Sequence, residues 1–142
     1  MKASARNQLA GTISKVQIGA VNAEIHVDLK SGETIVATIT KESAETLALK
    51  MGMEAIALIK APQIIIVTDF GGYQLSARNQ LQGEVSQVKP GAVNAEIDIE
   101  LAGGETIAAT VTNYSAEALG LRKGQQATAV FKAGAVILAI PG

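Results

Sequence analysis

Apolar and polar residues alternate along most of this chain, which is the pattern of half-buried β-strands. The clearest run is residues 21–29, in which every second position is apolar: Val21, Ala23, Ile25, Val27 and Leu29. Weaker alternation in residues 8–18 and 54–60, and a run of β-branched residues in 33–40, predict three more strands. Residues 64–67 are apolar without a break, so we expect a short strand that is covered on both faces.

A single short helix is expected between the third and fourth of these strands. Thr40 is a suitable N-cap, and Glu42 and Glu45 favour the first turns of a helix. Gly52 marks the end of the connection. Three strands, a helix and two further strands are the order of a small five-stranded Greek-key barrel of the OB type.

The same pattern occurs twice, at a constant offset of 72 residues. Residues 4–68 align with residues 76–140 without a gap, and 35 of the 65 aligned pairs are identical. Two copies of so long a period indicate two similar domains rather than a solenoid. We therefore expect an all-β protein with one short helix per repeat, built as tandem OB-like five-stranded Greek-key barrels. The expected boundaries are 1–68 for the first domain, 69–75 for the linker and 76–142 for the second domain.

The composition narrows the classes of function. Twelve basic and thirteen acidic residues give a net charge of −1, which provides no broad basic surface for nucleic acid or an anionic membrane. Cysteine is absent, so disulfides and thiolate metal sites are excluded. No apolar run approaches the ~20 residues of a membrane-spanning helix, and the first residues lack the apolar core of a secretory signal. We expect a cytoplasmic protein that contacts no membrane.

Catalysis is not expected. His26 is the only histidine, and the residue at its position in the second repeat is Asp98. A surface position on a strand explains His26 better than a role as general base. No set of nucleophile, base and orienting residue can be assembled. We therefore expect no enzymatic activity, no cofactor and no protein-bound metal ion.

The duplicated polar residues are nearly all hydrogen-bond donors: Ser4, Arg6, Asn7, Thr40 and Lys60, with Ser76, Arg78, Asn79, Thr112 and Lys132. Gly19 and Gly91 would expose backbone N–H groups at a turn, as in an anion-binding nest. Donors without acceptors suit a fully deprotonated oxyanion and disfavour hydrogen phosphate, whose proton would lack a partner. The simpler alternative is that these residues only begin strands and form turns.

A resemblance to a known family favours the anion site. Each repeat contains Ser-Ala-Arg-Asn-Gln-Leu, a following glycine, Gly-Ala-Val-Asn-Ala-Glu and a Lys-Ala pair after the fourth strand. In this combination the chain resembles the molbindins, the Mop or TOBE family of small molybdate-binding domains, in a two-domain (di-Mop) arrangement. The resemblance covers each repeat nearly end to end.

The resemblance implies a homotrimer of six domains with two classes of oxyanion site between domains and subunits. The first class would use Ser4, Ala5, Arg6, Thr40, Lys60 and Ala61, with Ser76, Ala77, Arg78, Thr112, Lys132 and Ala133. The second, near the threefold axis, would use Gly19, Ala20, Val21, Asn22 and Ala23, with Gly91, Ala92, Val93, Asn94 and Ala95. The repeats differ where Gly134 replaces Pro62 and Asn113-Tyr114 replaces Lys41-Glu42, so unequal binding is expected.

The function implied by the resemblance is intracellular binding, storage and homeostasis of molybdate and tungstate, rather than gene regulation or transport. Two alternatives stay open on the sequence. One is an OB-type nucleic-acid-binding module, although such modules need stacking aromatic residues and a basic groove. The other is a structural oligomer without a ligand.

Overall fold

A computed structural model describes all residues, 1–142, and contains ten strands, two α-helices and two 3-10 turns. The first repeat holds β1 (Asn7–Ile18), β2 (Asn22–Leu29), β3 (Thr34–Thr40), α1 (Lys41–Thr46), β4 (Glu54–Ile59), η1 (Ala61–Gln63) and β5 (Ile65–Val67). The second holds β6 (Asn79–Pro90), β7 (Asn94–Leu101), β8 (Thr106–Thr112), α2 (Asn113–Ala118), β9 (Gln126–Phe131), η2 (Ala133–Ala135) and β10 (Ile137–Ala139). The predicted order of strands and helix is confirmed in both repeats.

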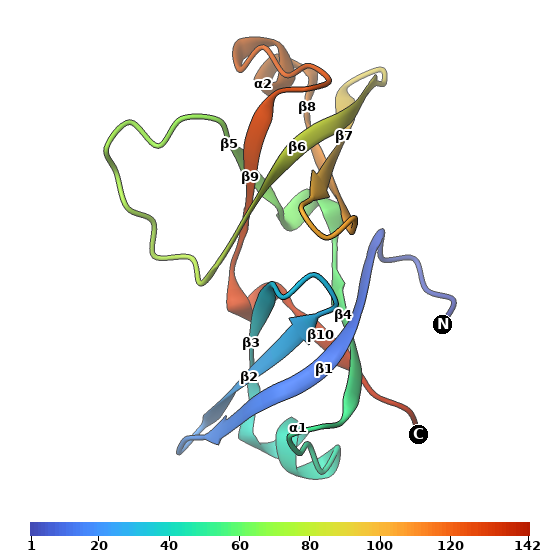
Figure 1. The fold of residues 1–142 in the computed structure, drawn as a ribbon, viewed down its shortest axis with the longest axis vertical. Coiled ribbons are helices and arrows are strands. Elements are labelled where there is room, and N and C mark those ends of the chain that lie inside the picture. Colours follow the sequence, from blue (N-terminus) through green and yellow to red (C-terminus); the bar gives the residue numbers. More distant parts are fainter. The chain divides into compact units, whose positions relative to one another are not determined.

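The strands form two antiparallel five-stranded sheets, and each sheet takes its fifth strand from the other repeat. One sheet has the order β10-β4-β1-β2-β3, and the other has the order β5-β9-β6-β7-β8. Leu138 of β10 pairs with Ala57 of β4, and Ile66 of β5 pairs with Ala129 of β9. Figure 1 shows β10 beside β4 in one sheet and β5 beside β9 in the other.

The compact units of the molecule therefore contain different segments of the chain than the sequence repeats do. The first unit comprises Met1–Ile59 with Lys132–Gly142, and the second comprises Lys60–Phe131. The domains expected from the sequence, 1–68 and 76–142, describe the repeats, whereas the chain changes unit after β4 and again after β9. A fifth strand can be exchanged because the repeats are so similar that its partner strand offers equivalent pairing positions.

The strand interiors follow the alternation that predicted them. In β2 the apolar positions Ala23, Ile25, Val27 and Leu29 are all buried. The prediction for residues 64–67 is wrong in part, because Ile65 is 61% exposed while Ile64 and Ile66 are buried. Ile137, its counterpart in β10, is 59% exposed. Each exchanged strand, which is the edge strand of its sheet, thus leaves one large apolar side chain exposed within the chain.

The two helices connect the third and fourth strands of their repeats, and each has six residues. Thr40 caps α1 as predicted, since its hydroxyl accepts a hydrogen bond from the Ser43 backbone N–H at 3.0 Å. Thr112 and Ser115 make the equivalent bond in α2. No helix of the structure is long and apolar enough to cross a membrane.

Gly83, in β6, lies where two backbones approach closely. A Cβ added there would be 2.4 Å from the carbonyl oxygen of Glu100 and 2.8 Å from the side chain of Ile99. The pairing of β6 with β7 shifts register just beyond it, between Val85 and Gln87. Gly11 has the same environment in the first unit. Glycine is therefore required at this position for close strand packing.

We expect Gly83→Ala to lower the free energy of unfolding by about 2 to 3 kcal/mol, because the ladder must shift to relieve a backbone clash. Gly134→Ala is the matched control, since a Cβ at Gly134 meets no atom within 4 Å. Equilibrium unfolding in urea measures both effects. Equal stability of the two variants would contradict the close approach at Gly83.

Candidate functional site

The segment before β1 is held in place by two side chains that follow it. Asn7 is 2% exposed, and its amide nitrogen donates to the carbonyl oxygen of Ile59 at 3.1 Å. Gln8 donates from Nε2 to the carbonyl oxygens of Ala3 and Ala5, each at 3.3 Å. Ser4 is exposed at the surface. Asn7 thus serves the fold, while the Ser4 hydroxyl is available to a ligand.

The second repeat builds the same arrangement before β6. Gln80 donates from Nε2 to the carbonyl oxygens of Leu75 at 3.2 Å and Ala77 at 2.9 Å. Asn79 is 1% exposed, and Ser76 is exposed. The duplicated Asn-Gln dipeptide is therefore a device that positions the preceding Ser-Ala-Arg segment.

The Lys-Ala pairs lie directly after the strands that pair with these segments. In the first repeat Asn7 pairs with Ile59, the residue before Lys60. Lys60 is exposed, and Ala61 is 1% exposed. Lys132 and Ala133 follow Phe131 in the same way, and Phe131 pairs with Asn79. Each lysine places an unpaired ammonium group at the end of a rigid strand.

Thr40 and Thr112 occupy a different end of their sheets. Thr40 pairs with Asn22, whereas Asn7 lies at the opposite end of β1. A strand of 12 residues spans roughly 35 Å if straight, at ~3.3 Å per residue. The structure therefore does not bring Thr40 together with the Asn7 end of its own unit. Its hydroxyl is also engaged, since it donates to the Ser43 hydroxyl at 2.8 Å in addition to capping α1.

Thr40 lies next to the turn of residues 19–22, because it pairs with Asn22. The Gly19 N–H donates to the Asn22 carbonyl at 2.8 Å, so the glycine N–H predicted to face an anion is occupied. The N–H groups of Ala20 and Val21 have no acceptor and are exposed. Gly91 bonds to Asn94 at 2.7 Å in the second repeat and leaves Ala92 and Val93 in the same state. The available donors at each turn are thus these two N–H groups.

The two turns differ in how they are held. Asn113 donates from Nδ2 to the Gly91 carbonyl at 2.9 Å, and its Oδ1 atom is buried without a partner. Lys41 holds the equivalent position in the first repeat and lies 4.0 Å from Glu45. The sequence showed that Asn113 replaces Lys41 in the second repeat, but it did not show that Asn113 holds the turn. The second turn is fastened by a side chain, and the first is not.

The remaining polar residues serve the sheets. His26 Nε2 lies 2.8 Å from Glu24 Oε2, and Lys15 lies 3.5 Å from the same oxygen. The side chains of His26 and Glu24 are partly buried, and that of Lys15 is exposed, on the surface of β1 and β2. No group of three or more His, Cys, Asp or Glu side chains is arranged to hold a metal ion.

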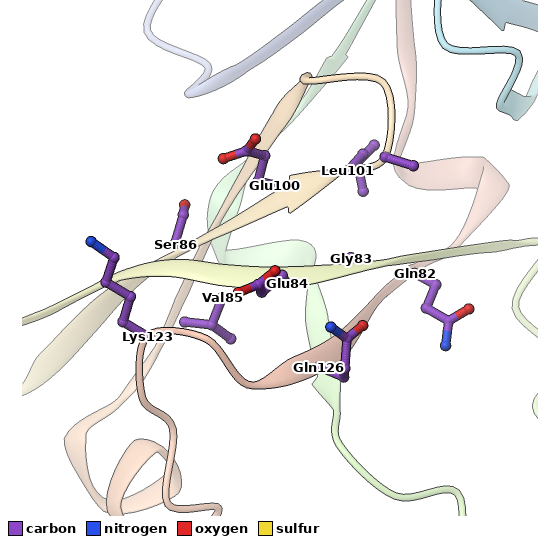
Figure 2. Close-up of a pocket in the computed structure, with 10 residues that line it drawn as sticks. Gln82, Gly83, Glu84, Val85, Ser86, Glu100, Leu101, Lys123 and Gln126 are labelled. Carbon is purple, nitrogen blue, oxygen red and sulfur yellow. The ribbon is translucent and has the colours of Figure 1, made fainter.

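The second unit also has a surface hollow that the sequence did not predict. It has a volume of about 580 Å³ and is lined in part by Gln82, Glu84, Ser86, Glu100, Lys123 and Gln126. Figure 2 shows the carboxylates of Glu84 and Glu100 on neighbouring strands of this hollow. Two carboxylates against one lysine disfavour an anion there. The hollow contains none of the candidate donors.

Comparison with known proteins gives matches to each repeat and to the whole chain. Residues 3–66 and 75–138 each match the TOBE domain. The chain is 49% identical over 140 residues to the molybdenum transport protein ModE of Herbaspirillum seropedicae, covering 99% of this chain and 52% of that protein. It is 43% identical over 141 residues to the molybdenum-pterin-binding protein MopA of Rhodobacter capsulatus, covering 99% of this chain and 53% of that protein. The chain thus spans about half the length of the curated relatives it matches.

A solved structure matches over the full length. It is the cytoplasmic molybdate-binding protein ModG, in a crystal form with molybdate bound. The identity is 48%, the TM-score is 0.96, and the alignment covers 99% of this chain and 100% of that one.

Proposed function

The chain belongs to the TOBE domain family, and from this premise we propose that it binds molybdate, with tungstate as an equivalent tetrahedral dianion. The observation that carries the proposal is a fold with a TM-score of 0.96 to molybdate-bound ModG. Each repeat of this fold carries one copy of the hydrogen-bond donors described above. Backbone N–H groups, serine hydroxyls and lysine ammonium groups match an anion that has only acceptors.

The ligand sites are completed between copies of the chain, as a homotrimer. One support is that Thr40 lies at the opposite end of β1 from Asn7, so a site that uses both ends is not complete within one unit. Another is the exposure of large apolar residues: Val21 (73%), Val93 (71%), Ile65 (61%) and Ile137 (59%). Exposed apolar positions of this kind mark interfaces when they gather in patches.

The cellular role is storage and homeostasis of molybdate in the cytoplasm. ModG is described as cytoplasmic, and it matches this chain from end to end. The ModE relatives share this region as about half of their length. The region common to all of them therefore accounts for oxyanion binding. A nucleic-acid-binding role is not favoured, since the exposed aromatic residues are only Tyr73 and Tyr114.

Thermal unfolding with added oxyanions tests the proposal. A ligand at 100 times its dissociation constant adds about 2.7 kcal/mol of stability, which raises Tm by roughly 5 to 10 °C. Molybdate and tungstate are expected to give this shift at micromolar concentration. Phosphate at pH 7 is expected to give little, because its proton finds no acceptor. An unchanged Tm with molybdate would refute the proposed function.

A further inference from the structure

The two Lys-Ala turns differ by one backbone hydrogen-bond donor. In η1 the Gln63 N–H donates to the Lys60 carbonyl at 3.0 Å, and in η2 the Ala135 N–H donates to the Lys132 carbonyl at 3.0 Å. Two residues lie between donor and acceptor in each turn, and any backbone N–H that they carry has no bonding partner. In the second turn they are Ala133 and Gly134, and both carry an N–H. In the first turn the second position is Pro62, which has none.

The backbones of the turns are otherwise alike. Lys60 has φ −71° and ψ 133°, and Lys132 has φ −72° and ψ 144°. Both turns close with a 3.3 Å bond, from Ile64 to Ala61 and from Val136 to Ala133. The replacement of proline by glycine therefore changes the available donors and leaves the course of the chain unchanged.

Gly134 is not required for backbone conformation. Its φ lies outside the left-handed region, and a Cβ at this position would meet no atom within 4 Å. Neither turn has a side-chain cap to occupy its free N–H groups. Gly134 is exposed and follows Lys132 by two residues.

We propose that Gly134 makes the Lys132 turn the stronger of the two oxyanion-binding copies, by adding a backbone N–H that Pro62 removes from the Lys60 turn. This inference rests on the proposed function. A molybdate dianion offers acceptors only, so one more charge-assisted hydrogen bond at the site strengthens binding roughly tenfold or more. The duplicated chain then holds a tighter and a weaker site, which lets it respond over a wider range of oxyanion concentration than two equal sites would.

Calorimetric titration of the full chain with sodium molybdate tests this, using Gly134→Pro, Gly134→Ala and Pro62→Ala. Alanine and proline both restrict the turn, but only proline deletes the N–H. We expect Gly134→Pro to weaken the tighter class of sites roughly tenfold or more, and Gly134→Ala, which keeps the N–H, to weaken it far less. Pro62→Ala restores an N–H and is expected to strengthen the weaker class.

These measurements distinguish failure of this inference from failure of the proposed function. Equal weakening by Gly134→Ala and Gly134→Pro would overturn the role of the N–H, as would unchanged binding by Gly134→Pro and Pro62→Ala. Pro62→Ala keeps the test decisive if Gly134→Pro fails to fold, which circular dichroism detects. Failure of the unsubstituted protein to bind molybdate would instead refute the proposed function itself.

Discussion

Deletion of residues 136–142 is expected to unfold the first unit while the second unit stays folded. The deletion removes β10, which supplies the outer strand next to β4. Leu138 is 8% exposed and Val136 is 3% exposed, so their loss opens the core formed by residues far away in sequence. Removing two buried apolar side chains and a strand of hydrogen bonds costs more than the ~5 kcal/mol that holds a small domain folded.

Hydrogen exchange measured by mass spectrometry distinguishes the two units. We expect the deletion to abolish protection of amides in residues 7–59 and to preserve it in residues 79–131. Point substitutions provide a matched pair: Leu138→Asp should destabilise the first unit, and Ile66→Asp, in β5, the second. Loss of protection in the repeat that carries the substituted residue would contradict the exchange of strands.

The individual strands and helices were predictable because interactions between residues close in sequence determine them. Alternation fixed β2, and Thr40 marked the start of α1 through a bond to a residue three positions away. The exchange of β5 and β10 was not predictable. The repeats share Ile65 and Ile137 at matching positions and present similar partner strands, so the apolar pattern of each fifth strand fits either unit. Only the three-dimensional path of the chain after β4 and β9 decides the pairing.

The residue types of the candidate site were predictable from the sequence. Their arrangement in space was less predictable. Sequence identified Ser4 and Lys60, which the structure leaves exposed and available. It could not reveal that the Gly19 N–H is used within its own turn, because that depends on backbone angles. It also grouped Thr40 with Lys60, although the ladder register places Thr40 next to Asn22. The register of a long strand depends on all of its residue pairs, so no short motif reveals which residues become neighbours.

Reversing the charge of both candidate lysines is expected to abolish tight oxyanion binding. Lys60 and Lys132 are exposed and form no ion pair within the chain, so their substitution leaves the fold unaffected, within ~0.5 kcal/mol. Lys60→Glu with Lys132→Glu removes a charge-assisted contact at each copy of the site and adds repulsion. We expect affinity for molybdate, measured by calorimetry, to fall roughly 100-fold or more.

A second double variant separates the contact from the overall field of the protein. Lys50 and Lys123 are exposed and precede β4 and β9, so a six-residue strand of roughly 20 Å separates each from the Lys-Ala turn that follows it. Lys50→Glu with Lys123→Glu changes the formal net charge from −1 to −5, as the first pair does, because each substitution changes it by −2. Exposed charges more than about 10 Å from an ion are largely screened at 0.1 M salt, so this pair should bind nearly as the unsubstituted protein does. An equal loss in both pairs would mean that net charge, rather than Lys60 and Lys132, governs binding.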